Sequence, residues 1–86
     1  MASYSVLIKR SAAREIEVLP LKDRRRVMDR IGALRDDPRP PGCEKLSAQE
    51  RYRLRQGDYR IIYSIEDVVL TVCVVRMGHR GDVYRG

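Results

Sequence analysis

The sequence predicts an α+β fold with an N-terminal strand, an αα-hairpin and then a three-stranded antiparallel meander, in the order β-α-α-β-β-β. Apolar residues recur at helical spacing between residues 12 and 34, whereas residues 52 to 77 show strand-like alternation and apolar runs. A proline- and glycine-rich stretch over 37–42 separates the two halves. A chain of 86 residues suits one small domain, which we expect to span residues 1–86.

The first half predicts a strand over 3–8 followed by two helices. Ser11 is expected to cap the first helix, with Glu15 in the first turn, where the helix dipole favours an acidic side chain. Pro20 either ends that helix or opens a second helix at its N1 position, and apolar residues over 21–34 predict the second helix. Its charged residues are expected to form a solvated face: Arg24, Arg25, Arg26, Asp29, Arg30 and Asp36.

The second half predicts strands over 52–56, 59–65 and 69–77, whereas residues 43–50 show no strong pattern. Gly57-Asp58 is the predicted turn between the first two of these strands, and Glu66-Asp67 the turn before the third. The third strand is apolar on both faces, which is typical of a central strand.

A two-residue turn at Gly57-Asp58 would place Arg55 opposite Arg60 and Arg53 opposite Ile62. Arginines would then crowd one face of the hairpin, although like charges in direct opposition destabilise a sheet. The other face would be apolar and tyrosine-rich, with Tyr52, Leu54, Tyr59, Ile61 and Tyr63. This cost suggests that the arginines serve an anionic ligand.

The formal net charge of +6 points to nucleic acid or an acidic partner. No apolar run approaches the ~20 residues that span a bilayer, and no signal-peptide pattern is visible. Cys43 and Cys73 lack the spacing of a zinc site, so we expect a reduced, cytoplasmic protein without a structural disulfide.

The sequence lacks the motifs of most enzymes, including a glycine-rich phosphate loop and paired histidines. His79 is the only histidine, so we expect no metal and no cofactor. The remaining set can bind phosphodiesters and stabilise developing negative charge. It comprises Arg53, Arg55, Arg60, Arg76, His79, Arg80 and Tyr84.

The stretches YRLRQGDYRIIYSI and VVRMGHRGDVYR resemble the RelE branch of the RelE/ParE toxin superfamily. The resemblance follows the element order of the whole chain and is strongest over 52–84. It implies the toxin of a type II toxin–antitoxin module, a ribosome-dependent endoribonuclease that cleaves mRNA in the 30S A site and inhibits translation. It also implies metal-independent cleavage by the 2′-hydroxyl, and a hetero-oligomer with an acidic antitoxin.

The same resemblance assigns roles to individual residues. Arg53 and Arg55 stand where RelE-like proteins often carry lysines, and Tyr84 stands at the catalytic tyrosine. The predicted catalytic residues are Arg55, Arg60, Arg80 and Tyr84, with His79 as a weaker candidate. The predicted RNA or phosphate ligands are Arg51, Arg53 and Arg76.

The chemistry fits these roles. Attack by a neighbouring hydroxyl needs a base, charge stabilisation on the phosphorane and an acid for the leaving oxygen. Arg60 and Arg80 would stabilise the charge, and Tyr84 would be the base, with its pKa near ~10 lowered by surrounding guanidinium groups. Arg55 is a poor proton donor and could act electrostatically only, in which case His79 would be the acid; the choice between Arg55 and His79 stays open.

Alternatives remain open at this point. Arg76 sits in a strand and is also placed to be a salt-bridging residue, Tyr84 to anchor the C-terminus, and His79 to be an ordinary turn residue. For the whole chain, the alternatives are a ParE-like DNA gyrase inhibitor, which needs no phosphodiester site, and an inactive basic RNA-binding domain.

Overall fold

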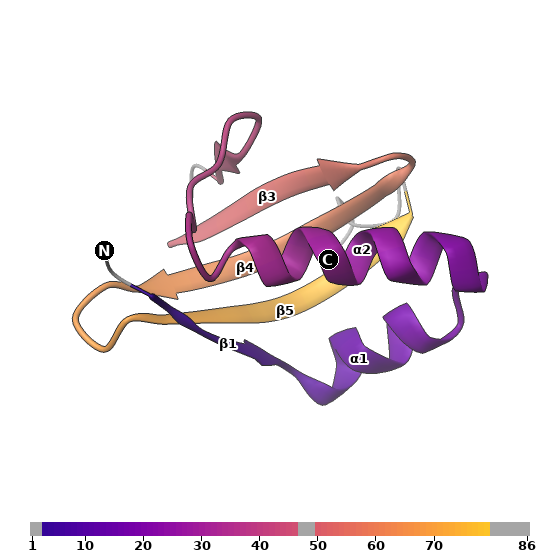
Figure 1. Ribbon diagram of the computed structural model, residues 1–86, viewed down its shortest axis with the longest axis horizontal. Helices are drawn as coiled ribbons and strands as arrows, with labels where there is room; N and C mark the ends of the chain where they lie inside the picture. Colours follow the sequence, from indigo (N-terminus) through magenta and orange to yellow (C-terminus); the bar gives the residue numbers. More distant parts are fainter. Residues whose placement is uncertain (1–2, 47–49, 80–86) are drawn as a thin grey trace.

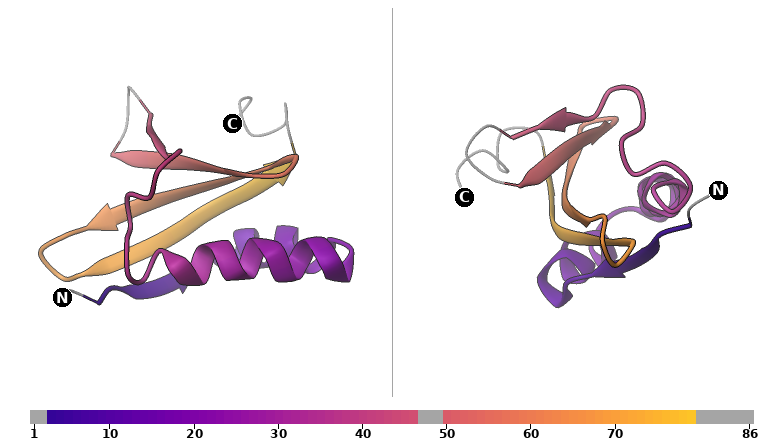
Figure 2. Two further views of the ribbon diagram at one scale, coloured as in Figure 1. Left: turned by 45° about the horizontal axis from the view of Figure 1, so that its top comes forward. Right: turned by 90° about the vertical axis from the view of Figure 1, so that its left-hand side faces the viewer.

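The computed structural model describes residues 3–46 and 50–79 and has two helices against a five-stranded sheet (Figures 1 and 2). The helices are α1 (Arg10–Glu17) and α2 (Leu21–Ala33). The strands are β1 (Ser5–Ile8), β2 (Glu44–Lys45), β3 (Arg51–Gln56), β4 (Tyr59–Glu66) and β5 (Thr71–His79). The predicted α+β class and element order are therefore confirmed, with β2 as an additional strand. No helix in the described ranges is long and apolar enough to cross a membrane.

The strands lie in the order β1-β5-β4-β3-β2. β1 runs parallel to β5, and the other three neighbouring pairs are antiparallel. A parallel pair needs a crossover, which α1 and α2 supply. Both helices consequently lie against one face of the sheet (Figure 2). β5 lies between β1 and β4, as its apolar sequence predicts.

The β3–β4 hairpin has the predicted register. Gln56 pairs with Tyr59 across the turn, and Arg55 pairs with Arg60. Gly57 has a φ of +60°, which is the conformation required at the first central position of a type II′ turn. The turn therefore fixes which side chains share a face.

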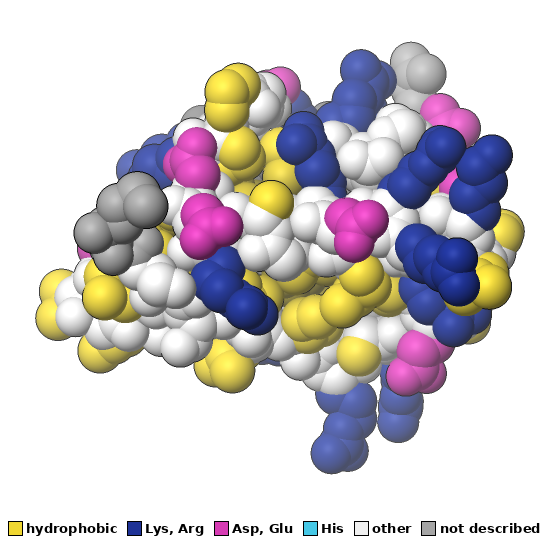
Figure 3. Space-filling view, viewed as in Figure 1, with side chains coloured by type: hydrophobic (Ala, Val, Ile, Leu, Met, Phe, Trp, Pro, Cys, Tyr) yellow, Lys and Arg dark blue, Asp and Glu magenta, His cyan; other side chains and the backbone are white. Residues whose placement is uncertain are grey.

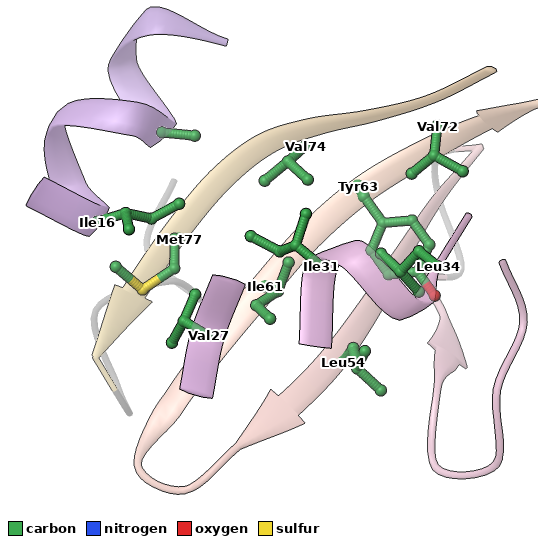
Figure 4. Packing of buried hydrophobic residues seen from close by; sticks show 11 residues of the cluster. Ile16, Val27, Ile31, Leu34, Leu54, Ile61, Tyr63, Val72, Val74 and Met77 are labelled. Atoms are coloured by element: carbon green, nitrogen blue, oxygen red, sulfur yellow. The ribbon is translucent and has the colours of Figure 1, made fainter. Parts of the chain in front are cut away.

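The core lies between α1, α2 and the helix-facing side of the sheet (Figure 4). Ile31 of α2 is 1% exposed and packs in one cluster with Ile61 and Tyr63 of β4. Tyr63 is fully buried and donates its hydroxyl hydrogen bond to the Pro38 carbonyl at 2.8 Å. Tyr63, which was predicted on the apolar face of the hairpin, is therefore part of the core, and its hydrogen bond holds the proline-rich loop against the sheet.

The start of α1 differs from the prediction. The Lys9 N–H donates to the Val74 carbonyl at 2.9 Å, so the chain leaves the sheet at Lys9 and the helix begins at once with Arg10. Lys9, not Ser11, is the N-cap residue, and it makes no side-chain capping bond. Glu15 lies beyond the first turn, and its Oε1 accepts a hydrogen bond from the Met77 N–H at 2.9 Å. Glu15 therefore bonds to the backbone of β5 and does not stabilise the helix dipole.

Strand boundaries also differ. β1 begins at Ser5, not at residue 3, and β4 extends through Glu66. The turn after β4 spans residues 67–70, and Leu70 at its end adopts a positive φ of 48°. β5 therefore starts at Thr71, and it continues to His79. The apolar residues of this turn resemble a strand in sequence although Val68 is 96% exposed. β2 was missed because it has two exposed residues and no alternation.

A polar cluster ties the proline-rich loop to the end of the sheet. Arg39 donates through Nη2 and Nη1 to the Asp67 carboxylate at 2.9 and 3.3 Å, and through Nε to the Tyr52 hydroxyl at 3.1 Å. The Tyr4 hydroxyl donates to Asp67 Oδ1 at 2.7 Å. The ring of Tyr52 stacks on the ring of Tyr63, with 5.8 Å between the ring centroids. Residues from four distant segments are therefore joined beside β3.

Replacement of Asp67 by asparagine is expected to remove a stabilisation that depends on pH. Hydrogen bonds from Arg39 and Tyr4 lower the pKa of Asp67 in the folded protein. A lowered pKa gives stability that is present above the unfolded value, near ~4, and is lost as the pH falls through the folded value. The melting temperature of wild type should exceed that of Asp67→Asn at pH 7, and the gap should shrink by pH 3. An equal gap at both values would contradict this role.

Candidate nucleic-acid interface

The arginines predicted from the hairpin lie on the face of the sheet that neither helix covers. Leu54 and Ile61 face the helices and are buried in the core, so their neighbours along each strand face the opposite way. Arg60 of β4 lies between Arg55 of β3 and Gly78 of β5. Three adjacent strands thus form this basic face.

Arg60 is the most unusual charge in the described structure. It is 7% exposed, and its Nη1 reaches the Tyr59 carbonyl only at 3.5 Å. No acidic side chain of residues 3–46 and 50–79 forms a salt bridge with it. A buried cation without a counterion is costly. The fold therefore holds a desolvated positive charge that a bound anion would neutralise.

Arg55 is exposed directly opposite Arg60 and makes no described salt bridge. The predicted like-charge pair is therefore present in the register. The hairpin is held by its other face, where the Tyr59 hydroxyl donates to Asp23 Oδ2 of α2 at 3.0 Å. This bond connects the start of β4 to α2.

The remaining predicted phosphate ligands differ in their surroundings. Arg53 Nη2 is 2.6 Å from Glu44 Oε2 of β2, so an acidic side chain already neutralises part of its charge. Arg76 Nε lies 3.8 Å from Glu15 Oε2, as the salt-bridge alternative predicts, although its side chain stays 45% exposed. Arg51 is half-buried and pairs with Ser64 in register.

Three predicted site residues stand at or beyond the end of β5. The backbone of His79 pairs with Tyr59 in register, which places this residue one position beyond the Arg60–Gly78 pair. Arg80 and Tyr84 lie outside the described residues. The described part of the site is therefore a platform of arginines, centred on Arg55 and Arg60, and the predicted base Tyr84 lies outside it.

A pocket of about 480 Å³ opens beside this platform. Its lining combines β3, β4, α2 and the loop before β3: Arg30, Gly42, Glu44, Arg53, Leu54, Arg55 and Arg60. Arg30 was predicted to lie on the solvated face of its helix, but it is half-buried and joins this lining. It stands three residues after Val27 and four before Leu34, so it borders the buried stripe. That spacing is the signal that sequence reasoning missed.

The helix-facing side of the molecule carries mixed charge. Lys and Arg side chains gather towards the end where α2 begins, with acidic side chains between and beside them (Figure 3). Arg25 and Arg26 are exposed there, as predicted for a solvated face. Among the described residues, no group of three or more histidine, cysteine or acidic side chains could hold a metal ion.

Comparisons with known proteins agree with this fold. The model of the family "ParE toxin of type II toxin-antitoxin system, parDE" matches residues 6–84. Toxin RelG of Mycobacterium tuberculosis is 31% identical over 84 residues, which cover 95% of this chain and 97% of that protein.

Two solved complexes share the fold over nearly their whole toxin chains. The toxin–antitoxin complex RelBE2 of Mycobacterium tuberculosis has a TM-score of 0.80 at 28% identity, covering 91% of this chain and 99% of that one. The archaeal RelE–RelB complex of Pyrococcus horikoshii has a TM-score of 0.84 at 28% identity, covering 93% and 98%. The chain belongs to the RelE/ParE superfamily of type II toxin–antitoxin toxins.

Proposed function

We propose that this toxin is a ribosome-dependent mRNA endonuclease that cleaves mRNA in the ribosomal A site without a metal. The observation that carries the proposal is Arg60, a desolvated guanidinium that has no described acidic partner and lies opposite Arg55. Such a charge is preorganised for the phosphorane that forms when a 2′-hydroxyl attacks the adjacent phosphate. Ribosomes place this activity in the cytoplasm.

The proposed reaction divides among residues of this chain. Tyr84 removes the proton of the 2′-hydroxyl, Arg60 and Arg80 stabilise the phosphorane oxygens, and the 5′ oxygen leaves with a proton from His79 or Arg55. Arg51, Arg53 and Arg76 bind neighbouring phosphates. Because Glu44 and Glu15 already contact two of these three arginines, we expect the weaker contribution from Arg53 and Arg76.

The proposed partner in the resting cell is an acidic antitoxin. Two of the similar structures are complexes of a RelE-type toxin with its antitoxin. An acidic segment that covers the basic face would neutralise Arg60 and exclude RNA together. The protein would then be a hetero-oligomer until the antitoxin is removed.

A second candidate function is inhibition of DNA gyrase, because the matching family model is described by the ParE toxin. The arginine platform argues against it, since a gyrase inhibitor needs no phosphodiester site. Cell-free translation with mapping of mRNA 5′ ends separates the two functions. The endonuclease produces new ends at the A-site codon, whereas a gyrase inhibitor produces none and abolishes supercoiling.

Tyr84→Phe and Arg80→Ala are each expected to slow single-turnover cleavage on programmed ribosomes by about 10²–10⁴-fold. Ribosome binding should change little, because several other arginines still contact phosphate. A pelleting assay supplies the binding measurement, and Arg25→Ala, on the exposed face of α2, is the control that should match wild type. Wild-type cleavage rates in both variants would remove the proposed base and electrostatic roles.

A further inference from the structure

We propose that the pocket between α2 and β3 is a second phosphate subsite, in which Arg30 binds a backbone phosphate of RNA beside the scissile one. The proposal rests on the proposed function for the identity of the ligand as RNA. The pocket itself stands on the geometry of the described residues. It extends the basic face around the edge of the sheet towards the helix.

Arg30 connects two hollows. It lines the pocket of about 480 Å³ together with Arg53, Arg55 and Arg60. It also lines a shallower hollow of about 370 Å³ with Arg26, Asp29 and Gln56. A chain that leaves the arginine platform past the edge of β3 would therefore pass Arg30. The described residues that line the larger pocket carry four guanidinium groups and one carboxylate, Glu44, so their charge strongly favours an anion.

The bonding of Arg30 supports a ligand-binding role. Its Nε is buried and has no hydrogen-bond partner, and no described carboxylate forms a salt bridge with its guanidinium. A buried donor without a hydrogen-bond partner destabilises the protein. Arg30 also lies in the last turn of α2, where a positive charge stabilises the helix dipole. The dipole accounts for a charge at this position, but not for the unpaired Nε.

The edge of β3 adds a backbone donor. Within the described ranges, β2 pairs only with Tyr52 and Arg53, which leaves the rest of β3 without a strand on that side. In a hairpin with a two-residue turn, Gln56 and Tyr59 form a hydrogen-bonded pair, so the backbone groups of Arg55 point away from β4. The Arg55 N–H therefore faces the open edge beside the pocket. Oriented backbone N–H groups and arginines together suit a phosphate.

The composition of the pocket favours RNA over a protein segment. Among the described residues of the lining, Leu54 is the only large apolar side chain, and it is only 1% exposed because the core buries it. A helix or strand of a protein partner would find no apolar surface to cover there, although such interfaces depend on buried apolar anchors. A phosphodiester needs only the charges and donors that are present.

The test compares wild type with Arg30→Ala, and uses Arg25→Ala as the matched control on the exposed side of α2. The probe is a short fluorescent RNA with 2′-O-methyl groups, which cannot be cut, titrated at several salt concentrations. Arg30→Ala should weaken binding about tenfold at low salt. It should reduce the slope of log affinity against log salt by about 0.7, as expected for one lost phosphate contact. Arg30→Lys should keep most of the slope, and thermal melts verify folding.

The outcomes separate this subsite from the proposed function. If Arg30→Ala binds RNA like Arg25→Ala, or if wild type does not bind the probe at low salt, the subsite is excluded whether or not mRNA is cut. If Arg30→Ala weakens only the complex with the antitoxin, the pocket takes an acidic peptide and the proposal fails. Weaker binding in a protein that does not cut mRNA would retain the subsite and reject the nuclease. If Arg30→Ala weakens binding to vacant and to mRNA-programmed ribosomes equally, the phosphate belongs to rRNA and the proposed position beside the scissile phosphate is excluded.

Discussion

Replacement of Arg60 by methionine is expected to slow mRNA cleavage by about 10²–10³-fold, the usual cost of removing one preorganised group that stabilises transition-state charge. Methionine fills a similar volume without the charge, so the packing around residue 60 is largely kept. Ribosome binding should fall much less, because Arg55 remains exposed for phosphate contact. Single-turnover cleavage on programmed ribosomes and a pelleting assay measure the two quantities separately.

The stability of the same variant provides an independent check. Arg60 is 7% exposed and pairs in register with Arg55. Its replacement therefore removes a buried charge and the repulsion between two like charges. The melting temperature of Arg60→Met should equal or exceed that of wild type. A clear loss of thermal stability would mean that Arg60 has a structural partner, and that slow cleavage in this variant reports misfolding.

Replacement of Leu54 by alanine is expected to destabilise the protein by about 2–5 kcal/mol, because it opens a cavity in the core. Leu54 is 1% exposed between two arginines of β3, and it packs with core residues from α2 and β4. A domain of this size loses about 4–8 °C per kcal/mol, so the melting temperature should fall by about 10 °C or more. Thermal unfolding followed by circular dichroism measures the shift.

Leu7→Ala is the matched control, because Leu7 also lies in a strand but is 57% exposed. It should change the melting temperature by only a few degrees. Leu54→Ala should still cleave mRNA at temperatures where it is folded, since no leucine takes part in the chemistry. A well-folded Leu54→Ala that fails to cut would show that the register of the hairpin alone does not position Arg53 and Arg55. Packing of the core against β3 would then also be needed.

The β3–β4 hairpin was predictable because its determinants are local. Gly57 permits the turn, the turn fixes the register, and period two then places Arg55 and Arg60 on one face. The same locality explains why α2 was found, since Val27 and Ile31 follow helical spacing.

Features that depend on distant contacts were missed. Nothing local in the sequence shows that Arg39 donates to Asp67, 28 residues away. Glu15 was assigned to the first turn of a helix because acidic residues near a predicted helix start usually stabilise the helix dipole. Its partner in the structure is instead the Met77 N–H, which is distant in sequence. Arg30 was placed in solvent because charge on a helix usually lies there, although the hollow beside β3 exists only after the sheet and helix pack.

The most direct test of the central claim is cleavage of an mRNA that carries a single 2′-deoxynucleotide immediately 5′ of the scissile bond, on programmed ribosomes with purified toxin. The proposed reaction uses the 2′-hydroxyl as nucleophile, so the unmodified mRNA should be cut at the A-site codon and the deoxy-substituted mRNA should stay intact at that bond. Equal cleavage of both mRNAs would show that water is the nucleophile. No cleavage of either would contradict the nuclease function itself.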